Sequence, residues 1–326
     1  MAEIVLVHGI DQQQKSADKL ESEWLPALAG GVRTAGFLGI ADRIWRDVAK
    51  PKRIETRMAF YGYLFLAPGQ QGDDPGDFTT EEAELSEALA LEWLEHTAAR
   101  ATKERIRETA GRELTYVTHQ MGAEQGVGKV VRSGISGLAK IPWFAPFGMG
   151  FAERFVRRSL AQVTRYLTDD AIRSAALESV LTLVEANTKV LIGHSLGSVV
   201  AYEAAHLIKQ PLPLLITLGS PLGLQTIVYQ RLRPQPPSFP PNVQRWVNVA
   251  DQDDFIAAEP HLEGLFSQGM LAGAVFEGGY TVDNGADPHN ANFYLGKAQV
   301  GRPTGEVFSG AAVSATNDGP PSPMSR

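Results

Sequence analysis

The feature that most constrains the fold of this chain is the segment Gly193-His194-Ser195-Leu196-Gly197, which joins an expected strand to an expected helix. The apolar, β-branched residues 189–192 precede it, and a helical pattern over about 196–209 follows it. A strand that passes directly into a helix needs a sharp, strained turn, and flanking glycines let the two elements approach closely. The pattern G-x-S-x-G in this setting predicts that Ser195 projects from the turn at a helix N-terminus, where the helix dipole favours developing negative charge.

Short apolar segments alternate with helical patterns along much of the remaining chain. Because strands separated by helices pair side by side in one direction, this alternation predicts an α/β fold: a mostly parallel sheet with helices on both faces. The expected strands are residues 4–7, 54–61, 189–192, 214–218, 243–249 and 274–280.

One interval departs from simple alternation, because more than a hundred residues separate the second expected strand from the third. Most of that interval has helical patterns, including two helices over 152–185 that break near residues 168–170. We therefore expect one α/β domain over residues 1–301 with a helical cap, residues 62–166, inserted before the strand that precedes Ser195. The Gly-, Ser- and Pro-rich segment 302–326 is expected to be a disordered tail.

Composition excludes several classes of protein. The 326 residues include no cysteine, which rules out disulfides, thiolate catalysis and cysteine-held metals. The formal net charge of −7 gives no reason to expect nucleic-acid binding, which requires a basic surface. The N-terminus passes at once into an expected strand without a signal-peptide pattern, and we expect the protein to be cytoplasmic.

Three segments together resemble the α/β-hydrolase superfamily, and most closely its lipase and esterase branch. They are Leu6-Val7-His8-Gly9-Ile10, the Ser195 turn, and Asp287-Pro288-His289-Asn290, within a resemblance that extends over about residues 4–296. The resemblance implies a serine hydrolase in which Ser195 is the nucleophile and His289 the general base. It also implies an oxyanion hole formed by the backbone amides of Ile10 and Leu196, with His8 bracing the loop rather than reacting.

The acid that would orient His289 is less sharply indicated. Residues 246–257 resemble the strand end that carries the acid in this superfamily. The usual form, an acid one residue before a short apolar pair, selects Asp254. Asp251 and Asp253 remain alternatives, because spacing along the chain does not show which carboxylate reaches the histidine.

The resemblance implies an ester substrate, either a small molecule or a lipid, and neither a metal nor an organic cofactor. Ser220 and Leu222 follow the next expected strand and are candidate pocket residues, although a purely structural turn explains them equally well. The apolar residues 141–151, flanked by cations, suit either a lid over an acyl pocket, a weak contact with a membrane surface, or a buried hairpin of the cap. An acyltransferase with the same residues and a catalytically silent binding protein are the alternatives to ester hydrolysis.

Overall fold

The computed structural model describes residues 2–46, 53–66, 78–121, 127–141, 149–257 and 259–310. Its centre is a six-stranded, all-parallel sheet with the strand order β2-β1-β3-β4-β5-β6. The predicted α/β class and parallel sheet are therefore confirmed. The strands are β1 (Ile4–Val7), β2 (Thr56–Ala59), β3 (Val190–His194), β4 (Leu212–Leu218), β5 (Val243–Asp251) and β6 (Val275–Val282).

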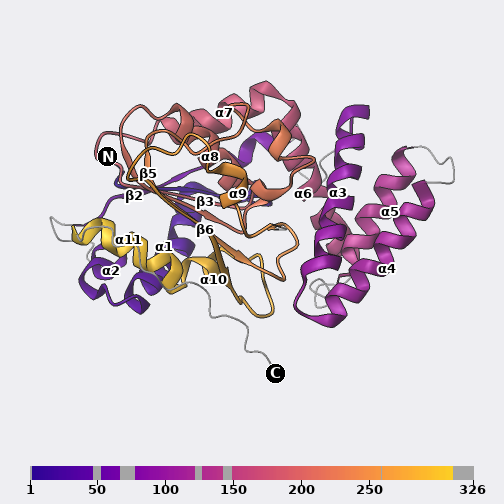
Figure 1. Cartoon of the computed structure of the whole chain (residues 1–326), viewed down its shortest axis with the longest axis horizontal. Coiled ribbons are helices and arrows are strands. Elements are labelled where there is room, and N and C mark those ends of the chain that lie inside the picture. The colour runs from indigo at the N-terminus through magenta and orange to yellow at the C-terminus, as the bar shows by residue number, and fades with distance from the viewer. Residues whose placement is uncertain are drawn as a thin grey trace.

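Helices cover both faces of this sheet (Figure 1). On one face lie α1, α2, α10 and α11, and on the other lie α7 and α8. A further group, α3, α4 and α5, stands together beyond the sheet, with α6 between it and the strands. The helices are α1 (Ala17–Thr34), α2 (Leu38–Trp45), α3 (Thr80–Arg100), α4 (Glu104–Met121), α5 (Val127–Ala139), α6 (Met149–Thr168), α7 (Asp170–Leu181), α8 (Leu196–Leu207), α9 (Glu263–Phe266), α10 (Ala291–Leu295) and α11 (Ala298–Ser309).

Both faces of the sheet are buried, which explains why its inner strands are continuous apolar runs rather than alternating ones. Along β1, Ile4 and Leu6 belong to the core that packs against α1. Val5 and Val7 belong to the opposite core, which packs against α8 and the helices beyond the sheet. Every residue of β1 and β3 is buried, so neither strand has a solvent-facing side.

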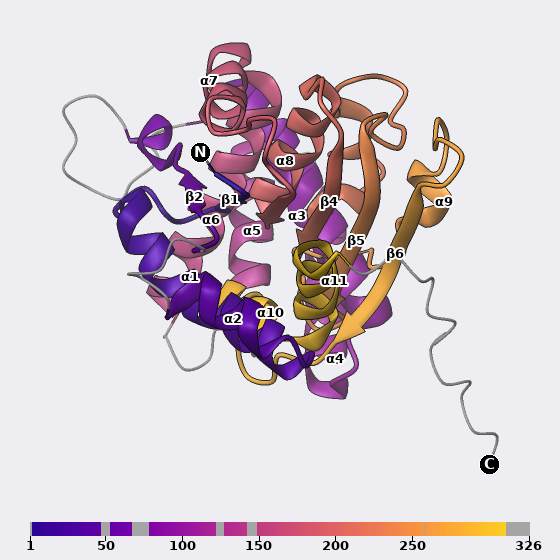
Figure 2. The ribbon, with the colours of Figure 1, turned by 90° about the vertical axis from the view of Figure 1, so that its left-hand side faces the viewer.

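The strand order marks one edge of the sheet as the expected place for a ligand. The chain moves from β1 to β2, which lie side by side in Figure 2, and then returns to β3, which pairs with the other side of β1. In open parallel sheets, ligands bind at the carboxyl ends of the two strands where the order reverses. Here those strands are β1 and β3, which are followed directly by His8 and Ser195.

The described residues between β2 and β3 are mostly helical, as the sequence indicates. The predicted break between the last two of its helices is confirmed, because Asp169 ends α6 and caps α7 by accepting hydrogen bonds from the amides of Ala171 and Ile172. None of the described helices is both long and apolar enough to cross a bilayer. Residues 142–148, the centre of the segment considered for lipid contact, lie outside the described residues.

The expected start of the tail at residue 302 is wrong. Residues 302–309 belong to α11, and only the segment 311–326 lies outside the described residues. Small residues in this helix and directly before residue 302 serve close packing. A Cβ atom on Gly301 would lie 2.0 Å from the Gly31 carbonyl oxygen of α1, and a Cβ atom on Gly305 would lie 2.3 Å from the Phe37 ring.

Two adjacent glycines in α1 test this packing. A Cβ atom on Gly31 would lie 2.3 Å from the Leu295 carbonyl oxygen, whereas nothing lies within 4 Å of one on Gly30. We expect Gly31→Ala to lower the free energy of unfolding by about 1–3 kcal/mol, because backbone atoms must move. Gly30→Ala should raise it by up to about 1 kcal/mol, because alanine favours helix. Equal effects of the two substitutions in chemical denaturation would contradict this account of the α1 contact.

Candidate active site

Ser195 occupies a strained turn between β3 and α8. Its φ of 56° and ψ of −131° lie in a region that non-glycine residues seldom adopt. The flanking glycines make the turn possible, because a Cβ atom on Gly193 would lie 2.4 Å from the Gly197 carbonyl oxygen. A Cβ atom on Gly197 would lie 2.3 Å from the carbonyl oxygen of His8. The predicted sequence of strand, sharp turn and helix is confirmed.

The loop after β1 (residues 8–13, the β1 loop) lies directly against the serine. A Cβ atom on Gly9 would lie 2.4 Å from Ser195 Cβ and 3.1 Å from Ser195 Oγ. Ile10 follows Gly9 in this loop, and Leu196 is the first residue of α8, where backbone amides have no acceptor within the helix. The two segments that were expected to form the oxyanion hole therefore both flank Ser195.

A histidine–aspartate pair lies at the same edge of the sheet. His289 Nδ1 and Asp254 Oδ2 are 2.7 Å apart, and both residues are buried. Asp254 lies in the segment formed by the end of β5 and the loop after it (residues 251–257, the acid loop), and His289 lies in the loop after β6 (residues 283–290, the histidine loop). Gly219 leaves room for the pair, because its Cβ atom would lie 2.9 Å from Asp254 Oδ2 and 3.2 Å from His289 Nδ1.

His194 links this pair to the serine turn. Its Nε2 lies 2.9 Å from the His289 carbonyl oxygen, and the two imidazole rings are 4.6 Å apart. Burial, reinforced by the neighbouring His289, lowers the pKa of His194 well below its usual value. His194 is therefore a neutral structural contact between the turn and the histidine loop. Ser195 Oγ is buried, and no described residue forms a hydrogen bond with it.

The three candidate aspartates have three different roles, and only Asp254 contacts His289. Asp251 accepts hydrogen bonds from the amides of Asn284 and Asp253, so it ties the acid loop to the histidine loop. Burial, with the carboxylates of Asp254 and Asp253 nearby, raises the pKa of Asp251 to about 6.

Asp253 points the other way, toward the residues between α3 and α4. Its carboxylate accepts the amide of Thr102 at 2.7 Å and forms an ion pair with Lys103 Nζ at 3.1 Å. Burial alone would raise the pKa of Asp253, but the hydrogen bonds from Lys103 and Thr102 outweigh it and lower that pKa. Arg100, two residues before Thr102 in the chain, forms an ion pair with Glu259.

A second set of contacts joins α6 to the β1 loop. Asp11 has a left-handed φ of 60°. Its amide donates to Gln162 Oε1 at 2.9 Å, and its carboxylate pairs with Arg158 at 2.8 Å. No sequence motif marks Arg158 or Gln162, because their role depends on where α6 lies and not on spacing along the chain.

The two candidate pocket residues lie at the end of β4, and both are buried. Ser220 is engaged locally: its hydroxyl forms a hydrogen bond of 2.6 Å with the Ser198 hydroxyl and accepts the amide of Leu222. These bonds shape the turn after β4. Contact of Ser220 or Leu222 with a substrate stays a prediction.

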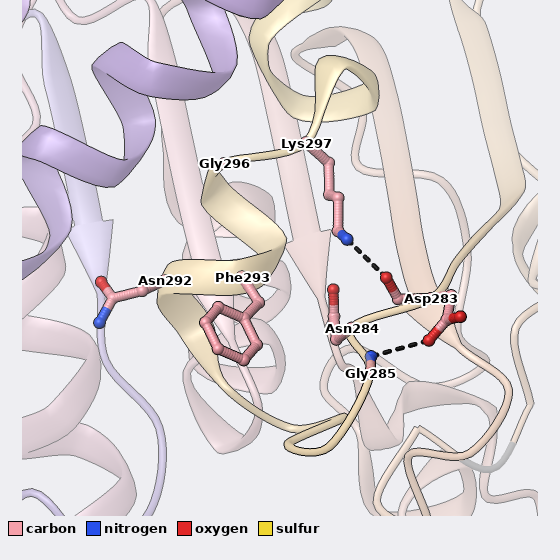
Figure 3. Close-up of a pocket in the computed structure, with 7 residues that line it drawn as sticks. All are labelled: Asp283, Asn284, Gly285, Asn292, Phe293, Gly296 and Lys297. Atoms are coloured by element: carbon pink, nitrogen blue, oxygen red, sulfur yellow. Dashed lines mark hydrogen bonds between the residues drawn. The ribbon is translucent and has the colours of Figure 1, made fainter.

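A shallow pocket of about 490 Å³ lies beside the histidine loop (Figure 3). Phe293 of α10 and Lys297 border it, and Lys297 Nζ donates to the Asp283 carbonyl oxygen at 2.5 Å. A second pocket, of about 420 Å³, lies between Arg100 of α3 and Gln252 of the acid loop. Within the part of the chain that the structure describes, no group of three or more acidic or histidine side chains could hold a metal ion.

Comparisons with protein-family models, with curated proteins and with solved structures give no match to this chain. Any assignment of a function to this site therefore depends on the geometry of the site alone. That geometry comprises a strained serine, a loop packed against it, and a buried histidine–aspartate pair, all at the carboxyl edge of a parallel sheet.

His8 gives this site a testable pH dependence. The Tyr61 amide donates to His8 Nε2 at 3.1 Å, so Nδ1 carries the proton that reaches the Gly9 carbonyl oxygen at 2.8 Å. His8 thus braces the β1 loop, as predicted. Burial, with a smaller effect of Lys15, lowers the pKa of His8 to about 4.

Since unfolded His8 gains its proton near pH 6.5 and folded His8 only near 4, its contribution to stability is present above pH 6.5 and is lost as the pH falls to 4. This loss amounts to about 3 kcal/mol. In His8→Gln, the side-chain carbonyl can replace Nε2 as acceptor and has no proton to gain. Between pH 6.5 and 4, we expect the free energy of unfolding of this variant, measured by urea denaturation, to fall by about 3 kcal/mol less than that of the wild type. Identical pH slopes for the two proteins would contradict the assignment.

Proposed function

We propose that this protein is a serine hydrolase of the α/β-hydrolase type, which cleaves carboxylic esters through an acyl-enzyme intermediate. The observation that carries the proposal is the convergence of Ser195 and the His289–Asp254 pair. They come from turns after β3, β5 and β6, and the bond between His194 and the His289 carbonyl oxygen joins the histidine loop to the serine turn. Serine, acid and histidine also follow one another along the chain in the order typical of that superfamily.

In the proposed mechanism, Ser195 Oγ forms a bond to the ester carbonyl carbon while His289 Nε2 takes the hydroxyl proton. The carbonyl oxygen becomes an anion, which the Ile10 and Leu196 amides stabilise. The carbon–oxygen bond to the alcohol then breaks, and His289 returns the proton to the departing alkoxide. A water molecule repeats the sequence on the acyl-enzyme, which releases the carboxylic acid and restores the serine hydroxyl.

Asp254 supports this sequence by fixing the orientation of His289. A carboxylate on Nδ1 leaves Nε2 as the proton acceptor and stabilises the imidazolium that forms when Ser195 reacts. The Ile256 amide, 3.1 Å from Asp254 Oδ1, holds the carboxylate in place from its other oxygen.

Acyl transfer is the alternative outcome of the same acyl-enzyme. Ser195 is fully buried, and a site that excludes water favours resolution of an acyl-enzyme by an alcohol or an amine. Analysis of the products with and without an added acceptor separates the two activities, since a transferase forms a new ester or amide instead of the free acid. The proposed substrate is an ester of a small molecule or a lipid in either case.

The adjacent aspartates allow a matched test of the proposal. In an assay with a panel of p-nitrophenyl esters, we expect Asp254→Asn to lower kcat by about 10⁴-fold, because His289 loses its orientation. Asp253→Asn should leave kcat within about tenfold and chiefly lower stability, because that carboxylate binds Thr102 and Lys103. Ser195→Ala should remove activity. No turnover of any ester by the wild type, or equal loss in the two aspartate variants, would contradict the proposed roles.

A further inference from the structure

Tyr294 of α10 lies fully buried against the acid loop. Its hydroxyl is 2.8 Å from Asp254 Oδ2 and 2.8 Å from the backbone nitrogen of Asp251. An amide can only donate, so the phenol oxygen accepts from Asp251 and its proton is directed to Asp254. The direction of this hydrogen bond is therefore fixed by the two partners.

The Asp254 oxygen that receives this proton is the one that His289 uses. His289 Nδ1 lies 2.7 Å from the same Oδ2, whereas Oδ1 accepts the Ile256 amide. Two donors on one carboxylate oxygen share its negative charge. Each donor is therefore bound less strongly by that oxygen than it would be if it were the only donor. A change in the phenol donor must then change the attraction between Asp254 and His289.

We propose that Tyr294 is a positioning residue of the candidate site: its hydroxyl fixes the Asp254 carboxylate and weakens that carboxylate's hold on the His289 imidazole. The catalytic consequence rests on the proposed serine hydrolase function. The electrostatic effect on His289 does not, since it follows from the shared oxygen alone.

Three other titratable groups near His289 form hydrogen bonds with partners other than its ring. His194, at the end of β3, is neutral and bonded to the His289 carbonyl oxygen. Asp251, at the end of β5, binds the Asn284 amide, and Asp287 on the histidine loop accepts from Asn290 at 2.8 Å. Burial, ahead of the nearby Asp254, raises the pKa of Tyr294 well above its usual value, so the phenol remains a donor throughout the working range.

Tyr294→Phe tests this role, because it removes the hydroxyl and keeps the ring. We expect the His289 imidazole, followed by NMR in the intact protein, to titrate about half to one pH unit higher than in the wild type. The acid limb of the kcat/KM profile should move by the same amount, and kcat should fall by about tenfold.

Tyr166→Phe is the matched control. Tyr166 is equally buried, and its hydroxyl donates to the Glu203 carboxylate at 2.6 Å, remote from the histidine loop in sequence. It should lower stability and leave both the His289 titration and the acid limb in place. If Tyr294→Phe behaves like this control, Tyr294 only packs and the proposal is overturned.

A second substitution tests the same hydrogen bond without removing the hydroxyl, and it remains informative if Tyr294→Phe folds poorly. Replacement of Tyr294 by 3-fluorotyrosine retains the hydroxyl and makes it a stronger donor, so the His289 titration should move to lower pH, opposite to the phenylalanine variant. A shift in the same direction, or none, contradicts the shared-oxygen account. A shifted titration in a protein that cleaves no ester would sustain the role of Tyr294 and count against the proposed function alone.

Discussion

The site depends on the contact between the end of β1 and the start of α8. Ser195 adopts a strained φ of 56°, and that strain is tolerated only because its surroundings leave the turn no alternative. Its amide donates to the Leu218 carbonyl oxygen at 2.9 Å, which anchors the turn to β4. Gly197 lies against the backbone of Val7 and His8, and Gly9 lies against Ser195 itself. A side chain on any of these glycines would push the β1 loop away from the serine.

The helices between β2 and β3 are attached to the site from two sides. Gln162 and Arg158 of α6 hold Asp11 in the β1 loop, whereas Thr102 and Lys103 hold Asp253 in the acid loop. The β1 loop lies against Ser195, and the acid loop carries the carboxylate bonded to His289. These helices therefore contribute directly to the positions of the proposed oxyanion loop and of the proposed acid.

The sequence predicts the parallel sheet and the serine turn, because each depends on local patterns of a few residues, and the family resemblance indicates His289 and favours Asp254. It leaves Asp251 and Asp253 as alternatives, because a carboxylate's partner lies far away along the chain. The contacts of Tyr294, Arg158 and Gln162 could not be predicted for the same reason. The part of α11 from residue 302 onward has the composition of a disordered tail, but its Gly305 serves close packing against Phe37.

The central claim is that Ser195 is the nucleophile, and a covalent probe measures this most directly. The protein is incubated with a small fluorophosphonate, its intact mass is recorded, and the modified peptide is sequenced. The account predicts a single adduct on Ser195, which is absent from Ser195→Ala. No adduct on the wild type, or an adduct on a different residue such as Ser198 that persists in Ser195→Ala, would contradict it.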